Sequence, residues 1–116
     1  YQSVLKDLKQ STRQRFVAQR FDFPKPELEV EVLQGETGID LRMARRLVNL
    51  ATALRALKEH DLEEAASTRL LVYTATLIRG GCDVLDACRA ALVEPLTDDE
   101  ETIEALMEVV HAAFGE

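Results

Sequence analysis

From residue 40 onward, apolar residues recur at the spacing of α-helices. The most regular stripe runs to about residue 58, with alternating spacings of four and three residues that place its members on one face. These members are Met43, Leu47, Leu50, Leu54 and Leu57. Asp40 directly precedes the stripe and is a typical N-cap residue. Arg42, Arg45 and Arg46 lie off the stripe, so we expect them on the solvated face of a long amphipathic helix.

A second helical segment, from Ser67 to residue 79, is apolar around most of its circumference. Its apolar residues are Leu70, Leu71, Val72, Leu77 and Ile78. Ser67 is a natural N-cap because its hydroxyl can accept a hydrogen bond from the first turn, and Gly80 and Gly81 favour a helix end. A helix that is apolar nearly all round is typically buried, so we expect this one in the middle of a bundle.

Two more helices are predicted towards the end of the chain. Asp83 is the expected N-cap of a shorter helix that Pro95 ends. The segment Thr97–Glu100 (TDDE) fits a capping box and begins the last helix. This last helix is expected to bury Ile103, Leu106, Met107, Val110 and Phe114. Glu104 and Glu108 fall on its opposite, solvated face.

An alternating pattern over residues 16–23 predicts one short strand near the start of the chain. Pro24 and Pro26 end it, because proline lacks the N–H that a strand needs. No other convincing strand follows, and a single strand cannot satisfy its own backbone hydrogen bonds. We therefore expect the rest of its sheet to lie outside this chain.

Residues 26–34 fit two structures. Pro26 suits the first position of a helix that Gly35 would close. The alternation in LEVEV (28–32) fits a strand equally well. The pattern leaves both alternatives open.

Composition places the chain among globular proteins. Of its 116 residues, 47% are hydrophobic and 30% are charged. Together with the periodicity, this predicts one small all-α bundle of four to five helices, preceded by the short strand. A net charge of −7 argues against a general nucleic-acid or anionic-membrane binder. No apolar run approaches the ~20 residues that cross a bilayer, and because the chain begins with Tyr1 rather than methionine we expect a fragment.

Residues that could carry enzyme chemistry are sparse. Cys82 and Cys88 lack metal-site or CxxC spacing, so we expect buried, reduced thiols in a cytoplasmic protein. His60 and His111 stand alone, without metal-ligand spacing. The sequence contains no GxxxxGK[ST], GxGxxG or GxSxG motif. We therefore do not expect a stand-alone catalyst and assign no metal ligand.

Arginines at the ends of predicted elements are the remaining chemical feature. Arg13 and Arg15 come just before the predicted strand. Arg69 lies in the first turn of the second helix, where the helix dipole disfavours a cation by roughly 0.3–1 kcal/mol. A helix N-terminus with an added guanidinium is, however, well suited to receive a phosphate. The alternative is that Arg69 pairs with Glu63 or Glu64.

Three segments carry a resemblance to a known family: STRQRFVAQRFDFP (11–24), EEAASTRLLVYTATLI (63–78) and ACRAALVEPLTDD (87–99). Together they resemble the C-terminal part of the CbbQ/NorQ group of MoxR-type AAA+ ATPases, over essentially the whole chain. The resemblance implies that residues 1–24 are the tail of the AAA+ core, and that the predicted strand is the last strand of its sheet. It implies that residues 25–116 form the helical lid.

The same resemblance suggests roles for the arginines. QRF resembles the arginine-finger element, which assigns a finger acting in trans to Arg15 and makes Arg13 a possible second arginine. STR resembles sensor 2, which assigns contact with a nucleotide phosphate to Arg69. The sequence has neither Walker motif nor a sensor-1 residue, so ATP and Mg²⁺ belong to the parent protein, and we expect no ATP hydrolysis by this chain alone.

By resemblance, the parent protein is an ATP-driven remodelling factor that assembles as a hexamer. Its implied partners are a von Willebrand A-domain protein and a client enzyme, either nitric oxide reductase, in maturation, or Rubisco, in activation. The competing hypothesis is a free-standing helical interaction module whose arginine clusters dock an acidic partner. A helix-turn-helix DNA binder needs a concentrated basic face, which the net charge of −7 makes a poor fit.

Overall fold

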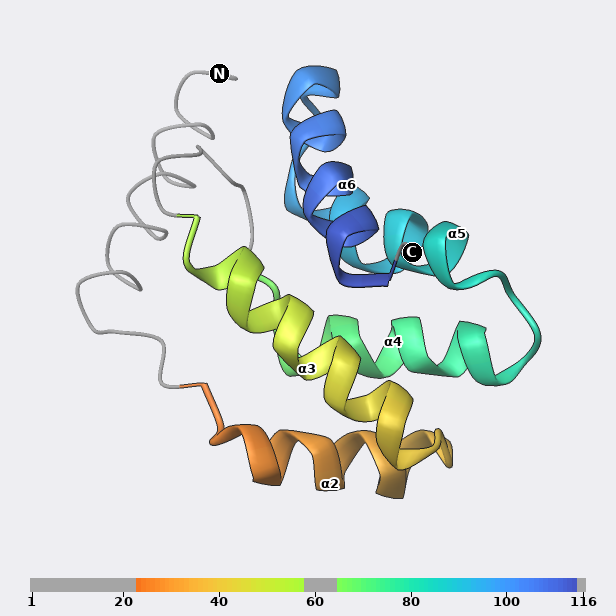
Figure 1. Cartoon of the computed structure of the whole chain (residues 1–116). Coiled ribbons are helices and arrows are strands. Elements are labelled where there is room, and N and C mark those ends of the chain that lie inside the picture. The colour runs from red at the N-terminus through yellow and green to blue at the C-terminus, as the bar shows by residue number, and fades with distance from the viewer. Residues whose placement is uncertain (1–22, 58–64, 115–116) are drawn as a thin grey trace, which may run out of the picture.

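The computed structural model describes residues 23–57 and 65–114 (Figure 1). Its elements, labelled as in Figure 1, are α2 (Pro26–Thr37), α3 (Leu41–Arg55), α4 (Thr68–Arg79), α5 (Val84–Cys88), the π-helical segment η1 (Arg89–Val93), the 3-10 segment η2 (Glu94–Leu96) and α6 (Glu100–Phe114). The described residues contain no strand. The predicted small all-α bundle is confirmed for this part of the chain. The strand predicted at residues 16–23 lies, except for Phe23, outside the described residues.

Helix α4 is central in the bundle, as its apolar sequence predicts. It packs against α2, α3, α5 and η1, whereas α6 packs against α3, α5 and η1. In Figure 1, α2 and α6 lie on opposite sides of the pair formed by α3 and α4. The expectation that α4 is buried nearly all round is wrong, because Tyr73 is 52% exposed and Leu77 is 40% exposed. No described helix is long and apolar enough to span a membrane.

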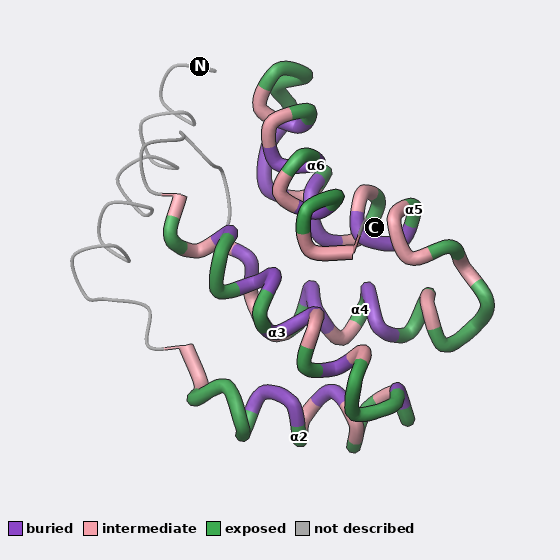
Figure 2. Tube along the Cα trace, in the orientation of Figure 1, coloured by how far each residue is buried: buried purple, intermediate pink, exposed green. Residues whose placement is uncertain are grey.

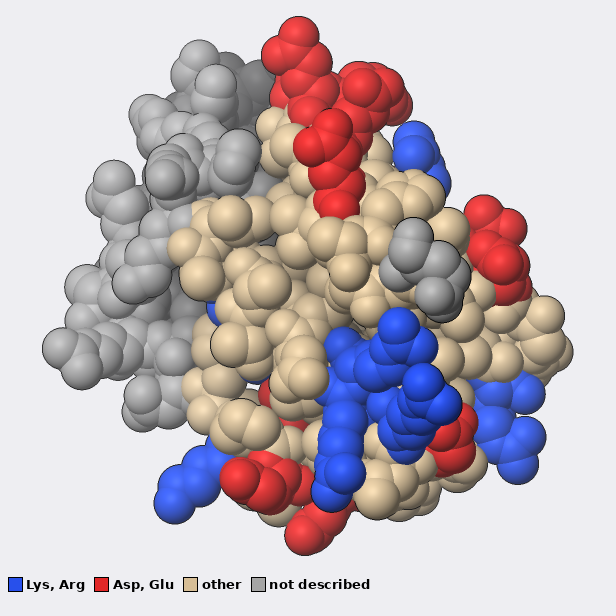
Figure 3. Space-filling view, in the orientation of Figure 1, with Lys and Arg blue, Asp and Glu red and all other residues tan. Residues whose placement is uncertain are grey.

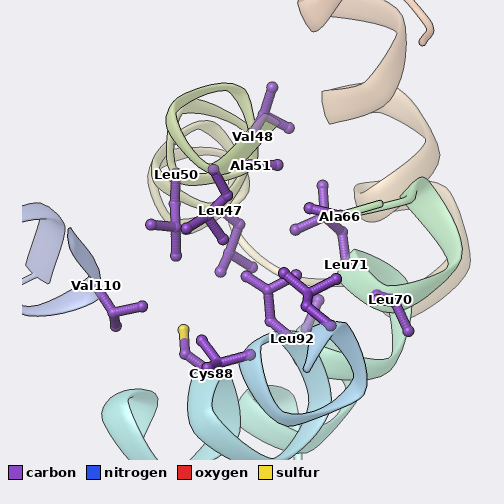
Figure 4. Close-up of a cluster of buried hydrophobic side chains, with 14 of the residues drawn as sticks. Leu47, Val48, Leu50, Ala51, Ala66, Leu70, Leu71, Cys88, Leu92 and Val110 are labelled. Atoms are coloured by element: carbon purple, nitrogen blue, oxygen red, sulfur yellow. The ribbon is translucent and has the colours of Figure 1, made fainter. Parts of the chain in front are cut away.

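The core is built where the inner faces of α3, α4, η1 and α6 meet. Figure 4 shows leucines of α3 and η1 directed towards one another, with Val110 of α6 beside them. Leu47, Leu71 and Leu92 are completely buried. The tube in Figure 2 shows buried and exposed residues alternating along α2, α3, α4 and α6, as expected for helices with one face in the core. The stripe predicted for α3 is confirmed as far as Leu54, but the helix ends at Arg55 rather than near residue 58, and Leu57 packs at the core edge after the helix. The buried residues predicted for α6 are confirmed, with Phe114 at the core edge.

Helix α2 decides between the two structures that fit residues 26–34. Its buried residues follow helical spacing: Glu29, Val30 and Leu33. Leu28, which an alternating strand would bury together with Val30, is 52% exposed. The helix also continues through Gly35, contrary to prediction, and ends before Gly38, whose positive φ of 76° supplies the left-handed cap.

The predicted helix caps are largely confirmed. Asp40 Oδ2 accepts a hydrogen bond from the Met43 backbone N–H at 3.1 Å. Ser67 Oγ accepts one from Leu70 N–H at 3.3 Å, and Asp83 caps α5 in the same way. These contacts span two to three residues, which is why the sequence pattern can predict them.

The capping box at the start of α6 is displaced from its predicted position. The N-cap is Asp99 and not Thr97, because Asp99 Oδ2 accepts hydrogen bonds from the backbone N–H and the hydroxyl of Thr102, at 2.9 and 2.7 Å. These hydrogen bonds hold the pKa of Asp99 below its usual value. Thr97 Oγ1 instead accepts from Asp99 N–H at 3.1 Å and shapes the preceding turn. An aspartate two residues nearer the helix takes over the cap.

The helix predicted from Asp83 to Pro95 is not uniform. Its α-helical part ends at Cys88, and the chain continues through the π-helical η1 and the 3-10 segment η2. Pro95 lies inside η2 rather than after the helix. Proline is tolerated in the first turn of a helical segment, where its missing N–H would have no partner.

The two cysteines differ in exposure, so the expectation that both are buried is half wrong. Both are free thiols; Cys88 is completely buried and Cys82 is half-buried. Burial, with a smaller contribution from the Asp83 charge, raises the pKa of Cys88 to about 12. The thiolate is the reactive form of cysteine. Cys88 is therefore protected in the folded chain because burial keeps reagents away from it and because its raised pKa keeps the thiol protonated.

We therefore expect a thiol reagent at pH 8 to modify Cys82 in the folded chain and Cys88 only after unfolding. Alkylation followed by peptide mass spectrometry, with and without guanidinium chloride, measures both sites in one sample. The unfolded sample is the control, since both thiols are exposed there. Equal rates at the two sites in the folded chain would contradict the placement of Cys88 in the core.

Candidate functional site: the N-terminal end of α4

Arg69 is the second residue of α4, in the first turn as predicted. Its side chain is exposed, and the first turn of α4 contains no acidic residue. Ser67 caps only part of this helix end, through Leu70 N–H. The partial positive charge of a helix N-terminus and a guanidinium therefore lie together at the surface.

No acidic side chain of the described residues forms an ion pair with Arg69. Glu63 and Glu64, the alternative partners, lie outside residues 23–57 and 65–114, as do Arg13 and Arg15. The predicted site residues are thus represented in the described structure by Arg69 alone, and the finger assignment of Arg15 stays a prediction.

Beside Arg69 lies a buried polar cluster that the sequence pattern does not predict. Glu29 of α2 receives two hydrogen bonds from Arg55 of α3, Nη1 to Oε1 at 3.1 Å and Nη2 to Oε2 at 2.6 Å. The hydroxyl of Thr68, the first residue of α4, donates to Glu29 Oε2 at 2.7 Å. Only 1% of the Glu29 side chain and 12% of the Arg55 side chain are exposed. We call these three residues the Glu29 cluster.

Arg55 also contacts the residues that precede α2 and the residues that precede α4. Its Nε donates to the carbonyl oxygen of Ala66 at 2.8 Å. Its guanidinium carbon lies 3.9 Å from the centre of the Phe23 ring, a cation–π distance. The buried guanidinium thereby connects the residues before α2 with the residues before α4.

The charges of Glu29 and Arg55 cancel within the cluster. A bidentate carboxylate–guanidinium pair is strong and directional, which suits a buried position. Because the pair is neutral, it does not offset the charge of Arg69. Among the described residues, the end of α4 therefore remains a positive site.

No sequence signal distinguishes Glu29 from its neighbours. Glu27 and Glu31 occur at the same two-residue spacing, and both are exposed. Only helical spacing places Glu29 with Val30 and Leu33 on the buried face, and the sequence left helix and strand open there. Arg55 was inconspicuous because it lies at the end of a stripe defined by leucines.

The arginines of α3 are not one solvated face. Arg42 and Arg45 are exposed as expected. Arg46 is half-buried: its Nη2 donates to the carbonyl oxygen of Ala113 at 3.1 Å, and its guanidinium lies 5.0 Å from the Phe114 ring centre. A cation is favourable at the C-terminal end of a helix, which explains why Arg46 packs against the end of α6 instead of extending into solvent. Figure 3 shows Lys and Arg side chains gathered over the start of α3 and acidic side chains over the first turns of α6.

The end of α4 fits a single contact with a nucleotide phosphate. An exposed guanidinium at a helix N-terminus can donate paired hydrogen bonds to phosphate oxygens. The sequence supplies no Walker motif to hold the rest of a triphosphate. In the part of the chain that the structure describes, no group of three His, Cys, Asp or Glu residues could hold a metal ion.

Comparison with known proteins supports the resemblance noted in the sequence. The family model described as "CbbQ/NirQ/NorQ C-terminal" matches residues 29–113. The chain is 57% identical to the denitrification regulatory protein NirQ of Pseudomonas aeruginosa, over 95% of its own length. It is 52% identical to the protein NorQ of Paracoccus denitrificans and 48% identical to the protein CbbQ of Hydrogenophilus thermoluteolus, in both cases over 99% of its length.

The matched part is a minority of each of these relatives. The chain covers 42% of NirQ from Pseudomonas aeruginosa and 43% of both NorQ and CbbQ. The family is nevertheless shown by the match to the family model over most of the chain and by the sequence identity of about half. The chain belongs to the CbbQ/NirQ/NorQ C-terminal family, within the MoxR-type AAA+ proteins.

Proposed function

We propose that this chain is the lid and arginine-finger portion of a longer, ATP-driven AAA+ remodelling protein that matures or activates a metabolic enzyme. The observation that carries the proposal is Arg69: an exposed arginine in the first turn of α4, without an acidic partner among the described residues, in a chain of this family. The helix N-terminus disfavours the Arg69 charge when no anion is bound, and a bound phosphate would reverse this unfavourable interaction.

In this proposal Arg69 donates hydrogen bonds to the phosphates of the nucleotide held by its own subunit. Helix α4 packs on most of the bundle, so a shift of Arg69 towards the phosphates would move the lid with it. Arg69 would thereby couple the lid angle to the nucleotide state. ATP, bound with Mg²⁺ by motifs outside this chain, supplies the phosphoryl group, and Arg15 would approach it from a neighbouring subunit.

The proposed assembly and partners follow the family. We propose a hexamer of the longer protein, a von Willebrand A-domain partner, and a client enzyme that is either nitric oxide reductase or Rubisco, in the cytoplasm. The relatives named above support a regulatory role, since NirQ is described as a denitrification regulatory protein.

Replacing Arg69 by alanine in the full-length protein tests this proposal. Hydrogen bonds to charged groups contribute about 1.5–3 kcal/mol, so we expect nucleotide affinity to fall about tenfold or more. Titration with a fluorescent ADP analogue measures the dissociation constant. The matched control is Arg42→Ala, which removes an exposed arginine from α3 and should leave affinity unchanged.

If Arg69→Ala binds the nucleotide as tightly as the unchanged protein, the sensor-2 assignment is wrong. The stand-alone interaction module then becomes the better hypothesis. In that case the exposed arginines of α3 would be its natural docking face, and pull-down with an acidic partner should depend on Arg42 and Arg45.

A further inference from the structure

We propose that Thr68, Glu29 and Arg55 are positioning residues for Arg69: the Glu29 cluster fixes the first turn of α4 so that the Arg69 guanidinium meets the nucleotide phosphate. This inference rests on the proposed function of Arg69 and adds to it the residues that orient the guanidinium. It gives the buried Glu29–Arg55 ion pair a role in orienting the nucleotide contact without touching the nucleotide.

Thr68, immediately before Arg69, attaches the start of α4 to the Glu29 cluster. Its hydroxyl donates to Glu29 Oε2 at 2.7 Å, and its β-branched side chain has few alternative rotamers. A hydrogen bond to a carboxylate is stronger than one between neutral groups. The first residue of α4 is therefore held to α2, a helix 39 positions away in the sequence.

The Glu29 cluster holds the chain on both sides of the N-cap residue Ser67. Arg55 Nε binds the Ala66 carbonyl oxygen at 2.8 Å, one residue before Ser67, and Thr68 follows Ser67 directly. Arg55 is itself held by both oxygens of Glu29. Residues 66 and 68 are thus fixed to one rigid ion pair, and Arg69 is the first residue after it whose side chain is exposed to solvent.

The start of α4 is held by more contacts than the starts of α3 and α6. The starts of α3 and α6 are each capped locally, by Asp40 and Asp99 through hydrogen bonds that span three residues. Helix α4 has such a local cap in Ser67 and the long-range attachment in addition. Beyond any contribution to stability, the attachment fixes the first turn of α4 relative to α2, which a local cap does not do. Catalytic and binding groups work only when held close to their productive geometry.

The experiment uses Thr68→Val in the full-length protein, because valine keeps the shape of threonine and Glu29 keeps both hydrogen bonds from Arg55. This avoids the folding defect that a change at Glu29 itself risks. Nucleotide affinity should fall about three- to tenfold, as expected for a lost hydrogen bond that acts through geometry. Thr68→Ser retains the hydroxyl and should restore affinity.

The matched control is Thr76→Val, which removes a hydroxyl from the same helix. Thr76 is exposed and its hydroxyl bonds only to the Val72 carbonyl oxygen of its own helix, at 2.7 Å, among the described contacts. The nucleotide affinity of the Thr76→Val variant should stay unchanged. Melting temperatures without nucleotide separate stability from positioning in all variants.

A double-mutant cycle with Arg69→Ala decides whether the cluster acts through Arg69. If it does, Thr68→Val causes no further loss once Arg69 is removed. Two results overturn the inference: the losses of the two variants multiply, or Thr68→Val lowers the melting temperature without changing affinity. Arg69→Ala alone reports on the proposed function, because a silent Arg69→Ala removes the sensor-2 role whatever Thr68 does.

Discussion

Replacing Arg15 by alanine in the full-length protein is expected to lower the ATP hydrolysis rate by about 10³- to 10⁵-fold. An arginine finger stabilises the charge that develops on the transferred phosphoryl group, and alanine has no donor to replace it. Steady-state phosphate release measures the effect. Arg42→Ala, on the exposed face of α3, is the matched arginine control and should retain full activity.

Mixing experiments test whether Arg15 acts across a subunit boundary. Arg15→Ala and a Walker-deficient form of the same protein are each expected to be inactive. Mixed in varying ratio they should regain activity, because a finger from one subunit then completes the nucleotide site of its neighbour. Full activity of Arg15→Ala alone would refute the finger assignment and make Arg13 the next residue to change.

Replacing Arg55 by alanine should destabilise the fold by about 3–5 kcal/mol, the usual cost of leaving a buried charge without its partner. Glu29 would keep only the hydroxyl of Thr68, with 1% of its side chain exposed to water. Urea unfolding of the 116-residue chain, followed by circular dichroism, measures the free energy of unfolding. Loss of the stacking contact with Phe23 adds to the effect.

The chain offers a matched control for this ion pair at its surface. Arg89 and Glu94 also form an ion pair, with 42% and 48% of their side chains exposed. Arg89→Ala should therefore cost at most about 1 kcal/mol. Replacing Glu29 and Arg55 together by methionine should recover most of the lost stability, because no buried charge remains. A cost for Arg55→Ala no larger than that for Arg89→Ala would contradict the role assigned to the buried pair.

The bundle itself was largely predictable because its signals are local. Asp40, Ser67 and Asp83 cap the helices that their positions predict, and the leucine stripe of α3 faces the core. Such interactions join residues two to four positions apart, so composition and spacing contain them. For the same reason the sequence predicts that Arg69 lies in the first turn of α4, where it is a candidate contact for a phosphate.

The remaining features depend on contacts between residues distant in the sequence. Residues 26–34 form a helix because the bundle buries side chains at helical spacing there. Tyr73 is exposed because no element of the described residues covers α4 on that side. Glu29 and Arg55 are 26 positions apart, and Arg46 reaches a carbonyl 67 positions away. A sequence lists charged residues, but only packing determines which of them leave water, and a buried charge needs a specific partner. The sequence by itself therefore determined α3, α4, α6 and the place of Arg69 in the first turn of α4. The tertiary structure decided that residues 26–37 form a helix and that Glu29 and Arg55 are buried against each other.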